Sequence, residues 1–193
     1  MYNVTAELPY ESTSDNFMDV GIHENVEMTR VEYGKTEKNE FIAFYFVGED
    51  GSKLSHTEWK PTLRADDTSE KLAEKELNQM SRIKQIVLNF ISEDKFVFQA
   101  NSFADFANKV VSLLGNTFVG VKLRLKVVYS GKYTSLPSYW KFRFIERMDK
   151  VPSDKSKIKV LSIDKMNRTP DPIPTTSNPF EISPALATGT SPF

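Results

Sequence analysis

Residues 118–146 read FVGVKLRLKVVYSGKYTSLPSYWKFRFIE, and this stretch decides the fold. In its first half, apolar residues alternate strictly with cations. Period-2 alternation is typical of a strand with one buried face and one solvated face. The solvated face is predicted to carry Lys122, Arg124 and Lys126.

The second half of the stretch repeats the pattern. Tyr139, Lys141 and Arg143 share one parity, and three aromatic residues that we assign to the core share the other: Trp140, Phe142 and Phe144. Two strands, each with an apolar side and a basic side, indicate a sheet surface that binds a polyanion. This interpretation requires the two basic faces to lie side by side and to point outward.

The charge of the chain is unevenly distributed. The 193 residues have a net charge of -1, but residues 121–168 hold 13 Lys and Arg against 4 Asp and Glu, whereas residues 1–120 hold 12 against 20. A local basic block of this kind is typical of nucleic-acid binding proteins. A lysine-rich solvated face is the simpler explanation, and the interleaved aromatic residues favour binding over it.

Several classes of protein are disfavoured by composition. The chain has no cysteine, so disulfides and thiolate metal sites are excluded, and it has no apolar run near the ~20 residues of a membrane span. The N-terminal residues do not resemble a signal peptide, so we expect a cytoplasmic protein. His23 and His56 are the only histidines, and no catalytic or phosphate-binding motif is present. We therefore expect neither an enzyme nor a metal or cofactor site.

Three strands are predicted before residue 60. Residues 20–33 form a long first strand whose apolar parity changes near Thr29–Arg30, which indicates a bulge and a bend. Residues 41–47 are apolar on both faces and form a central strand. A turn at residues 49–52, with Gly51, leads to the third strand at residues 53–59.

Two helices are predicted next. The spacing of Asp67 and Glu70 indicates a capping box for a helix over residues 67–91, whose apolar stripe includes Leu77 and Met80. A second helix begins at Ser102 and ends before Gly115. Short extra strands are possible at residues 95–99 and 157–163.

The domain boundaries follow from composition. Residues 1–17 are polar and acidic and are interpreted as an N-terminal arm, and residues 18–168 as the folded domain. Residues 169–193 are rich in Pro, Ser and Thr and are expected to form a disordered tail.

The order of three strands, two helices and two strands predicts a mainly β protein with an α insertion. It matches a five-stranded OB-fold-like barrel with a two-helix elaboration between strands 3 and 4. The main alternative is an α+β sandwich in which helices cover one side of an open sheet.

Binding of single-stranded nucleic acid needs cations for the phosphates and flat rings for the bases. The predicted cations are Lys122, Arg124, Lys126, Lys132, Lys141 and Arg143, and the predicted rings are Tyr45, Trp59, Tyr129, Tyr133 and Tyr139. Phe44 and Phe46 are assigned to the core. No predicted helix is basic enough to enter the major groove of a duplex. The alternatives are an RNA-binding module and a virion or scaffold protein whose basic face binds an acidic protein partner.

Residues 21–60 resemble the N-terminal half of single-stranded DNA-binding proteins encoded by tailed phages. The blocks NQMSRIKQI, SFADFANKV and LRLKVVY…LPSYWKFRFIE are similar to the same group, so the likeness covers about residues 18–148. The resemblance implies an OB-fold protein that coats intermediates of DNA replication or recombination in the host cytoplasm. Such proteins often end in an acidic tail with a terminal aromatic residue that recruits partners. This tail is nearly uncharged, but it ends in Phe193, which is a candidate docking residue for replication or recombination proteins.

Overall fold

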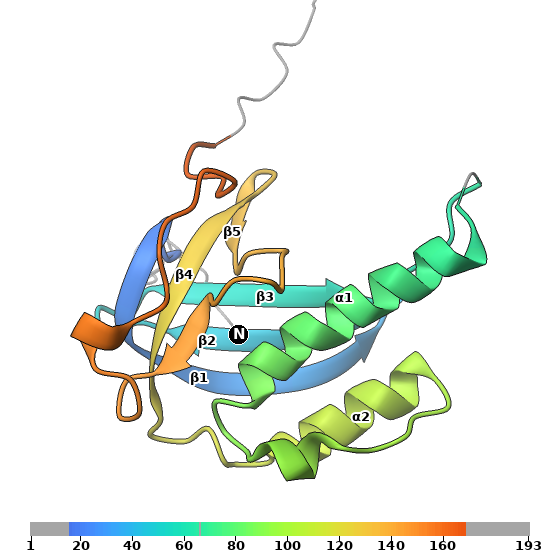
Figure 1. Cartoon of the computed structure of the whole chain (residues 1–193), viewed down its shortest axis with the longest axis horizontal. Coiled ribbons are helices and arrows are strands. Elements are labelled where there is room, and N and C mark those ends of the chain that lie inside the picture. Colours follow the sequence, from blue (N-terminus) through green and yellow to red (C-terminus); the bar gives the residue numbers. More distant parts are fainter. Residues whose placement is uncertain (1–15, 66, 169–193) are drawn as a thin grey trace, which may run out of the picture.

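The structure is a computed structural model that describes residues 16–65 and 67–168. The described chain is mainly β, with an open antiparallel sheet of six strands and two α-helices (Figure 1). The elements are β1 Gly21–Lys35, β2 Glu40–Val47, β3 Lys53–Trp59, α1 Ser69–Val87, α2 Phe103–Leu114, β4 Lys122–Ser130, β5 Tyr133–Ser135 and β6 Ile145–Arg147. Short 3-10 turns occur at Glu93–Phe96 and Ser153–Lys155. The predictions of a mainly β chain and of two helices are thus confirmed.

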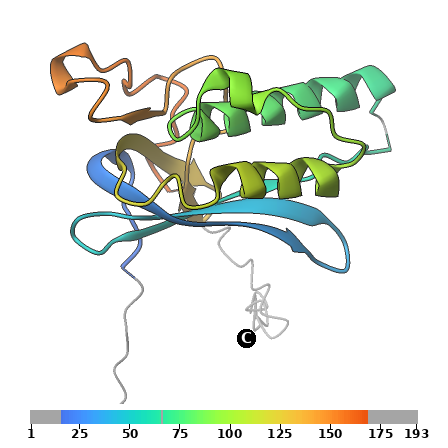
Figure 2. The same ribbon diagram turned by 90° about the horizontal axis from the view of Figure 1, so that it is seen from below.

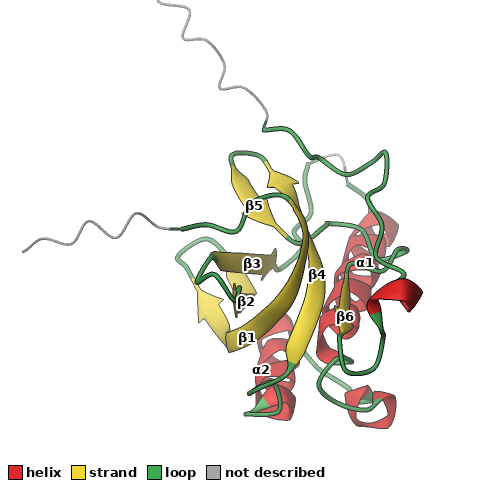
Figure 3. Cartoon of the chain, turned by 90° about the vertical axis from the view of Figure 1, so that its left-hand side faces the viewer, coloured by secondary structure: helices red, strands yellow, loops and turns green. Residues whose placement is uncertain are grey.

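The strands follow the order β3-β2-β1-β4-β5, and β6 also pairs with β4. The long strand β1 is shared, because it pairs with β2 on one side and with β4 on the other. The short strands β5 and β6 pair with opposite ends of β4 (Figure 3). Strand β1 therefore joins the β2–β3 hairpin to β4, and β4 joins β1 to the short strands β5 and β6.

Strand β1 is irregular at two positions. The register with β2 shifts between Met28 and Arg30, which confirms the predicted bulge. The register with β4 shifts between His23 and Val26, where Asn25 has a φ of 56°. Bulges bend a strand and increase its twist, so β1 curves between its two partners.

The β2–β3 hairpin follows the sequence pattern. Its strands occupy residues 40–47 and 53–59, within one residue of the prediction. Gly51 has a φ of 79° in the turn, a conformation that glycine adopts without steric strain. The predicted core rings Phe44 and Phe46 are buried.

Helix α1 begins two residues later than the predicted range of 67–91 and ends four residues earlier, at Val87. Thr68, not Asp67, is the N-cap, and its hydroxyl accepts a hydrogen bond from the Lys71 amide. Asp67 instead forms ion pairs with Lys71 and Lys75. The buried apolar residues of α1 lie in its C-terminal half, whereas Leu77 and Met80 are exposed.

Helix α2 matches the prediction. The Ser102 hydroxyl accepts a hydrogen bond from the Asp105 amide, and Gly115 caps the C-terminus with a φ of 44°. Both helices lie on the same side of the sheet (Figure 2). Their buried residues join the inward-facing side chains of β1, β2 and β4 in one core. Within residues 16–65 and 67–168, no helix covers the opposite face of the β1–β3 sheet.

Three predicted strands are wrong. Residues 95–99 contain a 3-10 turn, and residues 157–163 form no strand. The second basic strand is also wrong, because residues 136–144 leave the sheet and pairing resumes only at Ile145–Arg147. Pro137 lies where this excursion begins, and it has no amide hydrogen to continue a ladder.

The predicted tail and most of the predicted arm lie outside the described residues. At the boundary, Phe17 bridges to Lys53, whose amide donates to the Asn16 carbonyl at 2.8 Å. In the part of the chain that the structure describes, no helix is long and apolar enough to cross a membrane.

Candidate nucleic-acid interface

The basic face of β4 is buried, which contradicts the sequence-based expectation. The side chains of Lys126 and Arg124 are 0% and 3% exposed. Residues 151–165, which we call the covering segment, run along this face and provide partners for both cations (Figure 1).

Lys126 is held by the covering segment. Its Nζ donates to Asp164 Oδ2 at 2.7 Å and to the Lys159 carbonyl at 2.6 Å. The Tyr139 hydroxyl donates to the other Asp164 oxygen at 2.8 Å. Burial opposes ionisation of Asp164, but these hydrogen bonds outweigh it and lower its pKa. Burial and the hydrogen bond to Asp164 raise the pKa of Tyr139. Because its hydroxyl is bound within this cluster, Tyr139 is not an open stacking platform.

Arg124 is held by carboxylates from two strands. Its guanidinium donates to Glu24 at 2.7 Å and to Glu146 at 2.6 Å, and it also contacts Ser153. Lys122 is exposed but forms an ion pair with Glu27 at 2.7 Å. Two cations of the basic block are therefore paired with acidic residues of β1, and this pairing accounts for part of the uneven charge along the chain.

The remaining predicted cations do not join β4 in one face. Lys141 and Arg143 are exposed, but they lie on the excursion between β5 and β6. Trp140 and Phe142, which we assigned to the core, are also exposed there, and only Phe144 is buried. The basic residues of the two segments therefore do not lie side by side on one outward-pointing face, as the sequence interpretation required.

The outer face of the β1–β3 sheet carries a different set of rings and cations. Cross-strand pairing aligns Arg30 with Tyr45 and Ser55, and Gly34 with Phe41 and Trp59. The Phe41 ring lies over Gly34, where a Cβ atom would come within 2.2 Å of it. The Phe41 and Trp59 rings are 4.9 Å apart. An aromatic strip therefore follows the outer side of β2 and β3.

A groove opens beside this strip, where β3 faces the β4–β5 hairpin. Its main lining residues are Phe17, Ser55, Thr57, Trp59, Tyr129, Lys132, Tyr133 and Arg168, and we call it the outer groove. Three of its rings project into solvent, since Phe17, Trp59 and Tyr133 are 62%, 48% and 77% exposed. Among the described residues that line it, Asp19 alone is acidic. Four predicted site residues meet here: Trp59, Tyr129, Lys132 and Tyr133.

A second hollow continues the outer groove and shares Phe17 and Ser55 with it. Here the Arg30 guanidinium lies 4.0 Å from the centre of the Tyr45 ring. The Tyr45 hydroxyl donates to Glu32 at 2.5 Å, which raises the pKa of the tyrosine. The predicted residue Tyr45 thus lies on the same side of the sheet as Trp59.

Sequence reasoning missed Phe17, Arg30 and Arg168. Arg30 could have been found, because the predicted bulge changes the parity of β1 and directs Arg30 to the outer face. Phe17 and Arg168 lie near the predicted ends of the domain, where no periodic pattern places them.

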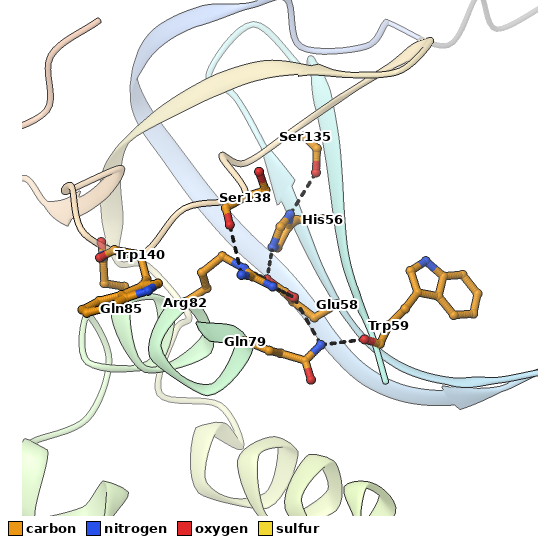
Figure 4. Close-up of polar contacts among 9 residues, drawn as sticks. All are labelled: His56, Glu58, Trp59, Gln79, Arg82, Gln85, Ser135, Ser138 and Trp140. Atoms are coloured by element: carbon orange, nitrogen blue, oxygen red, sulfur yellow. Dashed lines mark hydrogen bonds and ion pairs between the residues drawn. The ribbon is translucent and has the colours of Figure 1, made fainter. Parts of the chain in front are cut away.

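A buried polar network supports the floor of the outer groove (Figure 4). His56 on β3 contacts the Ser135 hydroxyl on β5 at 2.9 Å and Glu58 at 3.1 Å. The Arg82 guanidinium binds both oxygens of Glu58 at 2.7 Å. Gln79 donates to the carbonyl of Trp59 at 2.7 Å. The network links β3, β5 and α1 and thereby fixes the backbone that carries Trp59.

The network should make stability depend on pH. Burial opposes ionisation of Glu58, but hydrogen bonds from Arg82 and His56 lower its pKa from 4.5 to about 2. Stabilisation from a lowered pKa is complete above pH ~4.5 and is lost as the pH falls toward ~2. At about 1.4 kcal/mol per pH unit this amounts to roughly 3 kcal/mol. Urea unfolding should therefore show a smaller loss of stability between pH 5 and pH 2.5 for Glu58→Gln than for the wild type.

Glu37→Gln, in the exposed turn after β1, controls for the removal of a surface carboxylate. Parallel stability profiles for the wild type and Glu58→Gln across this pH range would contradict the assignment of the ion pair.

The described residues contain no group of three or more His, Cys, Asp or Glu side chains placed to hold a metal ion. Comparison of the chain with models of protein families finds none that matches, and comparison with curated proteins finds no match either.

Proposed function

We propose that this chain is a single-stranded DNA-binding protein without sequence specificity, and that it is not an enzyme. The DNA strand follows the outer groove and the aromatic strip of β2 and β3. The protein would coat single-stranded intermediates of replication or recombination, as the resemblance to phage proteins implies. Phe193 stays a candidate docking residue for partner proteins and lies outside the described residues.

The arrangement of the strands supports an OB-like barrel. Three antiparallel strands precede the helices, and β4 then pairs with β1, as expected for that topology. The two ends of the strand order, β3 and β5, approach each other through the His56–Ser135 contact at 2.9 Å. The outer groove lies where these ends meet, and this face of OB domains binds oligonucleotides.

One observation carries the proposal: three large rings are exposed around a single groove. Phe17, Trp59 and Tyr133 come from three separate parts of the chain. Apolar rings gathered in this way on a surface mark a binding site. Flat rings suit bases because every base has a stacking face, and stacking is independent of sequence.

The charges near the rings fit a phosphate backbone. Lys132 and Arg168 line the outer groove, and Arg30 and Lys53 line the adjoining hollow. Bases in a duplex are already stacked on each other, so these rings favour a single strand. Arg124 and Lys126 are buried in internal ion pairs, so these two cations do not support the alternative of a basic face that binds an acidic protein.

A fluorescence-anisotropy titration tests the proposal. Oligo-dT should bind more tightly than a duplex of equal length, and its affinity should fall with salt. About four phosphate contacts on a single strand give a log–log slope of about -2.8. Equal affinity for duplex, or no binding of oligo-dT at low salt, would refute the proposal. Tighter binding of oligo-U would assign the groove to RNA.

A further inference from the structure

The excursion between β5 and β6 presents a second set of rings and cations. We call residues 140–143 of this excursion the tip. There Trp140 and Phe142 are 39% and 48% exposed, and Lys141 and Arg143 are exposed beside them. Both rings are large apolar groups that a core would normally bury. Their exposure therefore calls for a role other than packing.

Hydrogen bonds attach the tip to α1. The side-chain amide of Gln85 donates to the carbonyls of Trp140 at 2.6 Å and Phe142 at 3.2 Å. Arg82, one turn earlier, donates to the Ser138 carbonyl at 3.0 Å (Figure 4). The Gln85 side-chain oxygen is buried and has no partner among the described residues. The hydrogen bonds from Gln85 and Arg82 fix the backbone of the tip. Its side chains therefore project outward before any ligand binds.

The chemistry of the tip fits a strand of nucleic acid. In the part of the chain that the structure describes, Lys141 and Arg143 form no ion pair, in contrast to Lys122, Arg124 and Lys126. Lys141 Nζ lies 5.9 Å from the centre of the Trp140 ring. A ring beside an unpaired cation can stack on a base and contact the adjacent phosphate.

Shared lining residues link the tip to the outer groove. The groove shares Tyr129 and Ser130 with a hollow on the other side of the β4–β5 hairpin, which is also lined by Tyr139 and Lys165. The Tyr139 ring in turn contacts the Phe142 ring edge-on at 5.7 Å. A strand that leaves the groove over the hairpin therefore reaches the tip.

We propose that residues Trp140–Arg143 form a second contact for single-stranded DNA, used only by strands long enough to cross the β4–β5 hairpin. The inference rests on the proposed function, because the outer groove holds the first part of the strand. The protein therefore has a longer site than the groove alone provides.

The test compares oligo-dT of about 8 and about 25 nucleotides, because single OB domains occupy about 4–16 nucleotides and only the longer strand exceeds that range. Trp140→Ala/Phe142→Ala should leave the affinity for the short strand unchanged and weaken that for the long strand about tenfold or more. Lys141→Glu/Arg143→Glu should also weaken binding of the long strand alone, and the affinity of this variant for the long strand should fall less steeply with salt than that of the wild type. Leu77→Ala/Met80→Ala, an exposed apolar pair on α1, is the matched control and should bind both strands normally.

The possible outcomes separate the two proposals. Unchanged affinity of both tip variants for both strands would overturn the inference and leave the outer groove intact as the site. Equal weakening for short and long strands would also overturn it, because the tip would then belong to the first contact. Failure of the wild type to bind either strand would instead overturn the proposed function.

Discussion

Replacing Trp59 and Tyr133 together by alanine should weaken binding of oligo-dT by about 30-fold or more. Each stacked base contributes roughly 1–3 kcal/mol, so the loss of two rings removes about 2–6 kcal/mol. Both rings project into solvent at the outer groove, and neither belongs to the buried core. Folding should therefore be largely preserved, although Trp59 loses its contact with Phe41. Anisotropy titration measures the affinity, and thermal unfolding checks the fold.

Two comparisons make this result specific. Trp59→Phe and Tyr133→Phe keep a flat ring and should retain most of the affinity, because stacking does not need the indole nitrogen or the hydroxyl. Val97→Ala removes an exposed apolar side chain far from the groove residues in sequence and should have no effect. A well-folded Trp59→Ala/Tyr133→Ala protein with the affinity of the wild type would show that the strand binds elsewhere.

The strands β1 to β3 and the two helices could be predicted because their signals are local. The apolar run of residues 41–47 and the glycine turn after it placed the β2–β3 hairpin, and the parity change in β1 placed the bulge after Met28. The cap of α2 was readable from Ser102 and Gly115. Each of these features depends on residues within a few positions of one another, so one sequence is sufficient to find them.

The surroundings of β4 could not be predicted, because they depend on contacts between distant residues. Alternation shows that a strand has two kinds of face, but it does not show what covers each face. Lys126 is 38 residues from Asp164, and Arg124 is 100 residues from Glu24. A row of cations that meets carboxylates from elsewhere in the chain has the same local pattern as a row that faces solvent.

Only part of the candidate site could be predicted, because contacts between distant residues also bring its members together. The sequence predicts Tyr45, Trp59 and Tyr133 as stacking rings, and the structure places them around two adjoining hollows on one side of the sheet. Their grouping depends on the approach of β3 to β5, which rests on the His56–Ser135 contact between residues 79 positions apart. Sequence patterns therefore identified several rings but not the groove that they share.

Replacing Asp164 by asparagine should destabilise the fold by about 3–5 kcal/mol. Both side chains of the Lys126–Asp164 pair are 0% exposed. Removing one member of a buried pair leaves the other charge without compensation, and this costs far more than the pair contributes. Urea unfolding at neutral pH measures the loss. Lys122→Met, which breaks the exposed pair with Glu27, is the matched control and should change stability by less than ~1 kcal/mol.

The double variant Lys126→Met/Asp164→Asn tests both the fold and the site. It removes both charges, and the asparagine oxygen still accepts from Tyr139, so most of the stability lost in Asp164→Asn should return. It should also bind oligo-dT as the wild type does, because Lys126 lies beneath the covering segment and contacts no DNA. If this variant folds well but loses affinity, the covering segment must open on binding, and the basic face of β4 would become part of the interface.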